Sequence, residues 1–419
     1  MQVVVVIPEF IASPGHRSTS ELLMRNICGV PLLIRTLATV QRAGAGEILL
    51  ISPMSVPEQL AQACIQSPLL RGSGAPRLVR VERFDPNDNS DWASLGDQLE
   101  DRFVWLPWNW VTHKQALASL TASGYSSTDW ALPTWITRSA LLAGETPEVL
   151  RGPRPEGIAV TSDDTAAAAE RLLVARSGKV LDGIHTSFNR RLCWPVVRWL
   201  SHTAATPNEV TFGGVLVAAL SAIAFAQGSY WWYVAGAFLF FIAGLFDEID
   251  GMLARIKFAD SPFGTWLEGF ADGLSYLLLF GGITVGLYRQ YGSRELLIGA
   301  ALLTGTLLSL IVTSLGRRRA TAPDRPNEYL GRFYRLLEED SSNWISKLVR
   351  QAQAFQKRGV LIHYVFIFTV LGGLPLLFYL AALGSHLTWI LALYFNHRFF
   401  SQPAQGADVA GIDIVREAS

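Results

Sequence analysis

The hydrophobic and polar positions divide the chain near residue 206. Before this point, short runs rich in β-branched residues alternate with segments in which apolar residues recur every three or four positions. After it, apolar segments of about twenty residues follow one another, the length that a helix needs to cross a bilayer. The first pattern predicts an α/β domain and the second predicts membrane-spanning helices.

Within residues 1–176 the pattern predicts strands at residues 3–8, 47–52, 77–82 and 103–106, and helices at residues 32–41 and 57–66. Alternation of this kind favours a mainly parallel sheet with helices on both of its faces. Residues 177–205 then place Arg190, Arg191 and Arg198 among aromatic and aliphatic side chains. This linker is predicted to be an amphipathic juxtamembrane helix in the membrane interface. An ordinary helix that packs between two domains is the alternative.

The second part, residues 206–400, contains six apolar segments, which predict an all-α membrane domain of six transmembrane helices. They span residues 210–226, 231–253, 263–287, 296–315, 360–383 and 386–395. The polar tail at residues 401–419 is predicted to be disordered. Residues 316–359 carry ten Lys or Arg, whereas the loops at 227–230, 288–295 and 384–385 carry only Arg289 and Arg294. The positive-inside rule therefore places the connector 316–359, and with it both termini, in the cytoplasm.

Charge and cysteine content narrow the classes of protein. The formal net charge is zero, so nothing in it argues for nucleic acid as a partner. Cys28, Cys64 and Cys193 have no paired spacing, which favours core packing over a disulfide framework or a zinc site.

Four carboxylates interrupt the second and third apolar segments: Asp247, Asp250, Glu268 and Asp272. An ionised Asp near the bilayer centre costs about 2.5–3.5 kcal/mol, so these groups are expected to face inward and share a positive partner. The members of each pair are three or four residues apart and therefore lie on one face of their helix. Carboxylate oxygens suit Mg²⁺, Mn²⁺ or Ca²⁺ better than soft metals.

Small and basic residues accompany the acids. Gly251, Ala254 and Gly264 remove side-chain bulk, which lets a phosphate or nucleotide approach the backbone, and Arg255 supplies a cation for phosphate oxygens.

The whole stretch resembles the motif of the CDP-alcohol phosphotransferase (CDP-alcohol phosphatidyltransferase) family, D-x2-D-G-x2-A-R-x8-G-x3-D-x3-D. Seven of its eight fixed positions match. The departure is Glu268, where the family has Asp, and the extra methylene moves that carboxylate by about 1 Å. Thr206-Pro207-Asn208 also resembles the entry to the first membrane helix of this family.

The resemblance implies an enzyme that moves a phospho-alcohol or phosphatidyl group from a CDP-alcohol to an acceptor hydroxyl and releases CMP. It implies two Mg²⁺ or Mn²⁺ ions, held by Asp247, Asp250 and Glu268, with Asp272 shared between metal binding and the role of general base. It further implies that Gly251, Ala254, Arg255, Gly264 and Asn208 contact the cytidine diphosphate. We expect the site on the cytoplasmic side of a prokaryotic plasma membrane, and the sequence leaves a homodimer open.

The first 175 residues resemble sugar-nucleotide and inositol-phosphate nucleotidyltransferases, on the stretches GVPLLIRTLATVQRAGAGEILLIS and VTSDDTAAAAERLL. This chain differs from those enzymes at the positions that bind triphosphate and metal. Residues 13–17 stand in place of a Gly-rich basic loop, and Trp108-Asn109 follow the strand after which a metal-binding Asp is expected. The domain is therefore predicted to be degenerate and catalytically inactive. Asp163 and Asp164 are either the remnant of a metal site or the start of a helix.

The fusion of the two parts resembles the bifunctional inositol-phosphate cytidylyltransferase and di-inositol-phosphate phosphate synthase. Both a CDP-inositol-like donor and CDP-diacylglycerol stay open, as does the acceptor alcohol. One rival function is a non-catalytic scaffold or ion-coupled transporter that uses the intramembrane acids. Another is a bifunctional enzyme whose cytidylyltransferase domain is active.

Overall fold

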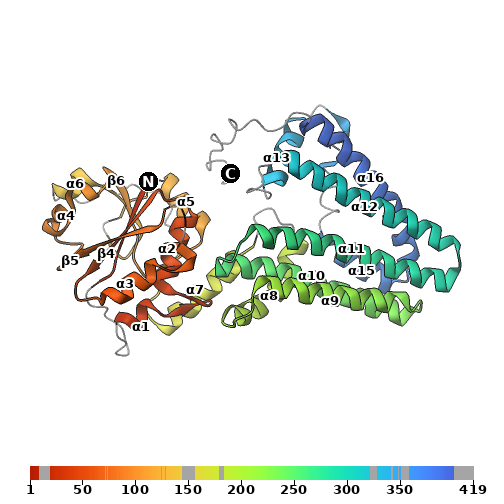
Figure 1. Ribbon diagram of the computed structural model, residues 1–419, viewed down its shortest axis with the longest axis horizontal. Helices are drawn as coiled ribbons and strands as arrows, with labels where there is room; N and C mark the ends of the chain where they lie inside the picture. The colour runs from red at the N-terminus through yellow and green to blue at the C-terminus, as the bar shows by residue number, and fades with distance from the viewer. Residues whose placement is uncertain are drawn as a thin grey trace.

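The computed structural model places an α/β domain at one end of a bundle of long helices (Figure 1). It describes residues 1–8, 19–70, 72, 74–123, 125–127, 129–143, 156–178, 184–320, 328–340, 343–347, 349–350 and 358–400. The predicted loop at residues 13–17 and the predicted disordered tail at 401–419 lie outside this part of the chain.

The α/β domain is built on a five-stranded sheet of order β5-β4-β1-β6-β8. Its strands are β1 (Gln2–Val6), β4 (Glu47–Pro53), β5 (Pro76–Val81), β6 (Arg102–Trp105) and β8 (Thr134–Thr137). The first four pair in parallel, and β8 runs antiparallel to β6. The predicted mainly parallel sheet is confirmed, and β8 is an edge strand that the sequence pattern did not predict.

Side chains alternate across this sheet and build a core on each face. Val3 and Val5 point into one core, and Val4 and Val6 into the other, where Trp92 is fully buried. This follows from the two-residue period of a strand. Strands that are apolar on both faces need cover on both, as predicted.

Helices and short strands complete the domain. They are α1 (Thr19–Leu23), α2 (Leu32–Arg42), α3 (Glu58–Ile65), α4 (Asn89–Leu95), α5 (Lys114–Ser123), α6 (Arg138–Leu142), α7 (Asp163–Arg176) and the 3₁₀ turns η1 (Pro68–Leu70) and η2 (Gly96–Gln98). Two antiparallel pairs join β2 (Asn26–Ile27) to β3 (Val30–Pro31) and β7 (Trp110–Val111) to β9 (Ile158–Ala159).

The second part is helical. Its helices are α8 (Ile184–Ser201), α9 (Pro207–Ala226), α10 (Tyr230–Lys257), α11 (Pro262–Tyr291), α12 (Arg294–Ala320), α13 (Glu328–Glu339), α15 (Arg358–Val370) and α16 (Leu374–Phe400). In the described residues, four of them, α9, α11, α12 and α16, are long and apolar enough to cross a membrane, and α15 carries a shorter apolar stretch. These helices support an integral membrane protein, and the predicted count of six spans is not confirmed.

The predicted division of the last two apolar segments is wrong. The chain turns at residues 371–373, where Gly372 has a φ of 76°, and α16 then continues through Gly384 and Ser385. A glycine at positive φ ends a helix readily, whereas Gly and Ser inside a long apolar helix are tolerated.

Helix α9 packs against both α10 and α11. The contact with α11 is close because of glycine: a Cβ on Gly282 would overlap the carbonyl oxygen of Ala222. Small residues at such positions let helix backbones approach in a membrane. The outer face of α9 exposes a stripe of large apolar side chains, Phe212, Leu216, Leu220 and Ile223.

Helix α8 has one buried stripe, and its amphipathic role stays a prediction. Asn189, Cys193, Val197 and Ser201, spaced four apart, are buried. The exposed apolar side chains are Phe188, Leu192, Trp194, Val196 and Trp199. That face has the aromatic character of a membrane interface, and its location in the lipid stays a prediction.

Candidate active site

The end of the bundle where α10 leads into α11 adjoins the α/β domain (Figure 1). Asp247 and Asp250 are in the last turns of α10, and Glu268 and Asp272 are in the first turns of α11. Between the helices the chain turns within residues 258–261. Phe258, with a φ of 55°, ends α10, and the Ser261 hydroxyl accepts a hydrogen bond from the Gly264 amide at 2.9 Å to start α11.

Asp250 is held by α9. Asp250 as a whole residue is 4% exposed, and its carboxylate accepts a hydrogen bond from the Thr211 hydroxyl at 2.5 Å. A buried carboxylate needs such donors because burial removes its water. Thr211 therefore belongs to the site, although the sequence analysis did not single it out. The sequence signal was small: Thr211 lies one turn after the Thr-Pro-Asn helix start.

The two pairs of acids lie on the ends of α10 and α11 that the turn at residues 258–261 joins. Asp247 of α10 is within electrostatic range of the Tyr276 hydroxyl, and Tyr276 lies one turn beyond Asp272 on α11. Glu268 of α11 is within electrostatic range of Arg255 on α10. The two pairs therefore lie at one end of the bundle, and a site that they share stays a prediction.

Arg255 reaches toward the linker as well as toward the acids. Its Nε donates to the carbonyl oxygen of Ser177, and a Cβ on Gly251 would lie 3.3 Å from its Nη1. Gly251 therefore makes room for the guanidinium group one turn away. Ala254, beside Arg255, is half-buried on the same helix.

Asn208 and Gly264, which come from different helices, lie side by side. A Cβ on Gly264 would stand 3.5 Å from Asn208 Oδ1. The first turn of α9, fixed by the capping box of Thr206 and Glu209, therefore adjoins the first turn of α11. Asn208, Gly264 and the acids belong to one end of the three-helix group.

The donor chemistry of the acids fits a hard divalent ion. Their side chains are not gathered for one: in the described residues no group of three or more His, Cys, Asp or Glu is close enough to hold a metal. Metal binding by Asp247, Asp250, Glu268 and Asp272 thus stays a prediction.

His363 and the two N-terminal acids have structural partners. His363 Nε2 lies 3.0 Å from Asn189 Oδ1 of α8, so this histidine is a satisfied helix residue. Asp163 and Asp164 are in the first turn of α7, whose N-cap is Ser162, and Asp163 forms an ion pair with Arg25. Of the two roles left open for these aspartates, the structure supports the helix start, and the N-cap itself is Ser162.

Hollows on the surface of the described part of the α/β domain include one at each edge of the sheet. One, at the carboxyl ends of β1 and β6, is lined by Trp105, Trp108 and Asn109, and its only carboxylate among described residues is Asp85. Asn109 donates to the Val160 carbonyl at 3.0 Å, a structural bond at the place where a metal-binding Asp was expected. The absence of catalysis here stays a prediction.

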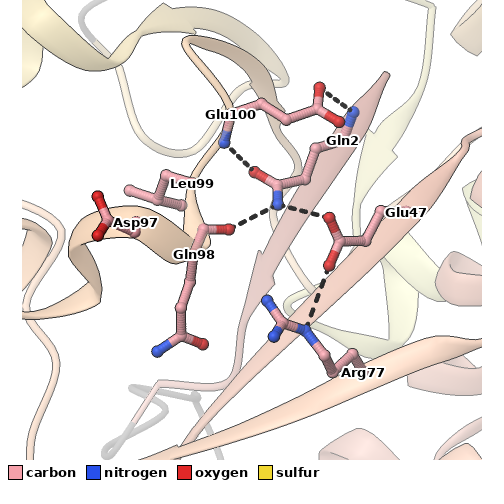
Figure 2. A pocket seen from close by; sticks show the side chains of 7 residues that line it. All are labelled: Gln2, Glu47, Arg77, Asp97, Gln98, Leu99 and Glu100. Carbon is pink, nitrogen blue, oxygen red and sulfur yellow. Dashed lines mark hydrogen bonds and ion pairs between the residues drawn. The ribbon is translucent and has the colours of Figure 1, made fainter.

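The other hollow lies at the amino ends of β1 and β4, and Figure 2 shows its polar side chains bonded to one another. Gln2 donates to Glu47 at 2.9 Å, and Glu47 forms an ion pair with Arg77 at 3.2 Å (Figure 2). These contacts tie neighbouring strands together. Cys28, Cys64 and Cys193 are free and buried, as core packing predicted.

Comparison with known proteins agrees with the motif. Residues 204–337 match the family model described as CDP-alcohol phosphatidyltransferase. The archaetidylinositol phosphate synthase of Methanothermobacter thermautotrophicus is 35% identical over 109 residues, which are 26% of this chain and 52% of that protein. The phosphatidylinositol phosphate synthase of Corynebacterium glutamicum is 29% identical over 109 residues, 26% of this chain and 48% of that protein.

A longer match covers 56% of this chain. It is to the bifunctional IPC transferase and DIPP synthase of Aquifex aeolicus, 25% identical over 235 residues and 49% of that protein. The chain thus spans about half the length of each of these relatives. The resemblance predicted from the motif is confirmed: residues 204–337 are similar to the CDP-alcohol phosphatidyltransferase family.

Proposed function

We propose that this protein is an integral membrane CDP-alcohol phosphotransferase. The acceptor hydroxyl attacks the phosphorus that bears the donor alcohol, the bond from that phosphorus to the bridging oxygen breaks, and CMP leaves. A new phosphodiester forms, and the acceptor proton passes to a carboxylate. The observation that carries the proposal is that four acids lie on the joined ends of α10 and α11, within the region that matches the family model.

Asp272 is the proposed base. It lies one turn beyond Glu268 on α11, and Tyr276 follows one turn later on the same face of that helix. An ordinary aspartate is ionised at neutral pH and can take the proton of the acceptor hydroxyl. Asn208, Gly251, Ala254, Arg255 and Gly264 are the proposed contacts of the cytidine diphosphate.

Asp247, Asp250 and Glu268, with Asp272, are the proposed ligands of Mg²⁺ or Mn²⁺. When bound, two such ions would neutralise the charge on the pyrophosphate oxygens. The chain's own contribution is to hold the carboxylates: Thr211 orients Asp250, and α9 packs against and supports α10 and α11. Because the side chains are not gathered in the described residues, we expect metal and donor to draw them together.

The test is CMP release from purified protein. CDP-diacylglycerol and CDP-inositol are each supplied with Mg²⁺ or Mn²⁺ and with glycerol phosphate, inositol phosphate or inositol as acceptor. We expect release with at least one pair, and the pair identifies the substrates. Asp272→Asn should keep donor binding and lose about 10²–10⁴-fold in turnover, the usual contribution of a general base. Retention of more than about a tenth of parent turnover would show that Asp272 is not the base.

The rival membrane functions make different predictions. A transporter or scaffold would release no CMP with any pair, although its acids could still carry ions. An active cytidylyltransferase domain would release pyrophosphate from CTP and inositol phosphate. We expect no pyrophosphate, because Asn109 stands where the metal-binding carboxylate is expected and bonds to Val160.

A further inference from the structure

The α/β domain forms hydrogen bonds to the short turn between α10 and α11, which joins the two halves of the motif. Arg35 of α2 is 1% exposed and points away from its own sheet toward α10. Its guanidinium donates to the carbonyl oxygens of Ile27 at 3.0 Å, Cys28 at 3.4 Å and Ile256 at 2.9 Å. The third bond crosses from the α/β domain to the last turn of the acid-bearing helix α10.

Arg35 is charged in this position. Burial lowers its pKa to about 10, which still leaves the guanidinium protonated at neutral pH. A buried charge is costly unless it is hydrogen-bonded, and the three carbonyl oxygens supply those bonds. The contact with Ile256 is therefore part of what makes Arg35 tolerable in the interior.

A second arginine of α2 holds the turn itself. Arg42 donates to the carbonyl oxygen of Phe258 at 3.0 Å and lies 3.5 Å from the Asp260 carboxylate. The guanidinium groups of Arg35 and Arg42 lie 5.1 Å and 5.4 Å from the centre of the Phe258 ring. These are cation–π distances.

The turn is also held from the side of the linker. Lys257 donates to the carbonyl oxygens of Thr203 at 2.7 Å and Ala205 at 2.9 Å, just before α9. Nearby, Glu170 of α7 forms an ion pair with Arg198 of α8 at 3.0 Å. Residues 256–260 are thus fixed between the α/β domain and the segment that leads into α9.

We propose that the α/β domain is a positioning domain for phosphoryl transfer, and that α2 sets the relative placement of the two acid pairs through Arg42 and Arg35. The proposal rests on the proposed function of the acids. Asp250 lies six residues before Ile256 on one continuous helix, about 9 Å along its axis. A shift of the turn therefore moves the carboxylates of α10 relative to those of α11.

The size of the effect follows from the demands of the reaction. Transfer requires the acceptor, the donor and the carboxylates to be correctly positioned relative to one another. A misplacement of about 1 Å can lower the rate about a hundredfold. The affinity for the donor depends less on this relative positioning. Loss of the contacts between α2 and the turn should therefore lower kcat more than it changes the KM for the donor.

Arg42→Ala is the informative variant, because Arg42 is partly exposed and its removal leaves no buried charge. Arg35→Ala would leave three carbonyl oxygens without their donor inside the protein and could unfold the domain. Arg138 provides a matched control. Like Arg42 its side chain is 32% exposed, it donates to a carbonyl oxygen at 3.0 Å, and it pairs with a carboxylate, Asp101, at 3.2 Å. Its two partners both belong to the α/β domain.

With the donor and acceptor pair that gives CMP release, we expect Arg42→Ala to lower kcat about tenfold or more, while the donor KM changes less than about threefold. Arg42→Lys, which keeps the charge and one donor, should recover part of the loss, and Arg138→Ala should match the parent. An active parent whose kcat is unchanged in Arg42→Ala would overturn the proposal.

A second measurement does not depend on activity. Hydrogen exchange at residues 256–260 should be faster in Arg42→Ala than in the parent and in Arg138→Ala, since lost contacts lower the free energy of local opening. Equal exchange in all three proteins would show that α2 does not hold the turn. Failure of the parent to release CMP would instead refute the proposed function. The hydrogen-exchange result would still show whether α2 stabilises the turn at residues 256–260.

Discussion

At the scale of single residues, the site is defined by four carboxylates in otherwise apolar helices. Such groups are costly inside a membrane, so their presence indicates a function. Asp250 is nearly fully buried and is satisfied by Thr211 from another helix. Such partners fix the orientation of a carboxylate before any ligand arrives, which lowers the cost of assembling the site.

Thr211→Val tests this orienting bond. Valine keeps the shape of threonine but removes the hydroxyl that donates to Asp250. We expect CMP release to fall about 10–100-fold, the usual effect of losing a partner of a metal-binding group. Thr211→Ser, which keeps a hydroxyl, should stay close to the parent. If the valine variant equals the parent across a titration of Mg²⁺ and Mn²⁺, the bond has no role in the reaction.

Glu268→Asp restores the residue usual in the family, and we expect it to lower activity here. Helices spaced for the longer side chain would leave the shorter carboxylate about 1 Å back, and misplacement of that size can cost about a hundredfold. Glu268→Gln should be less active still, because it also removes the charge. The measurement is turnover at saturating Mg²⁺ and Mn²⁺. An Asp variant at least as active as the parent would mean that no matched geometry surrounds Glu268.

At the scale of elements, the position of the acids depends on how closely α9 approaches α11. Gly282 and Gly286 face the backbone of α9, and a Cβ on Gly286 would overlap the carbonyl oxygen of Phe225. A backbone cannot move aside as a flexible side chain can. The spacing of these helices, and hence the width of the site at their other end, is set by the small size of these two residues.

Gly282→Ala should therefore destabilise the membrane domain. Overpacking a tight contact costs about 1–3 kcal/mol, which exceeds the gain of about 1 kcal/mol in helix propensity. Gly281→Ala is the control and should be neutral or stabilising, because the methyl group of an alanine at this position would meet no atom within 4 Å. Thermal unfolding in detergent compares the two. Equal melting temperatures would show that α9 and α11 can separate without cost.

The elements also show what a sequence can predict. The central strands and the helices that carry the acids were predicted because apolar periodicity and a long motif mark them. The division between α15 and α16 was misplaced, since Gly372 and Gly384 look alike in sequence and only one adopts a positive φ. The hydrogen bond from Arg35 to Ile256 could not be predicted, because its acceptor is a backbone carbonyl oxygen, which every residue offers.

At the scale of the whole molecule, the α/β domain lies at the end of the bundle where α10 ends and α11 begins (Figure 1). These two helix ends carry the acids. The opposite end, at the turn between α9 and α10, exposes Tyr230, Trp231 and Trp232. Aromatic side chains of this kind gather where a membrane meets water. A cytoplasmic α/β domain therefore requires a cytoplasmic active site, which a soluble nucleotide or CDP-alcohol headgroup can enter.

Cysteine labelling tests this orientation. Glu82→Cys places a thiol on the exposed surface of the α/β domain, and Ser293→Cys places one in the turn between α11 and α12. The native thiols give little background, because all three are buried and burial raises the pKa of Cys64 to about 11 and of Cys193 to about 12. A thiol reacts as its thiolate, so these groups stay inert at neutral pH.

In sealed right-side-out vesicles, an impermeant maleimide should label Ser293→Cys and leave Glu82→Cys unlabelled until the membrane is permeabilised. The physical reason is the excess of Lys and Arg in residues 316–359, which resist translocation, against the sparse charge of the turns at the other end. Labelling of Glu82→Cys in sealed vesicles would place the α/β domain outside. Because Arg35 and Arg42 tie that domain to the motif, the acids would then have to face outward too, and a cytoplasmic nucleotide donor would be excluded.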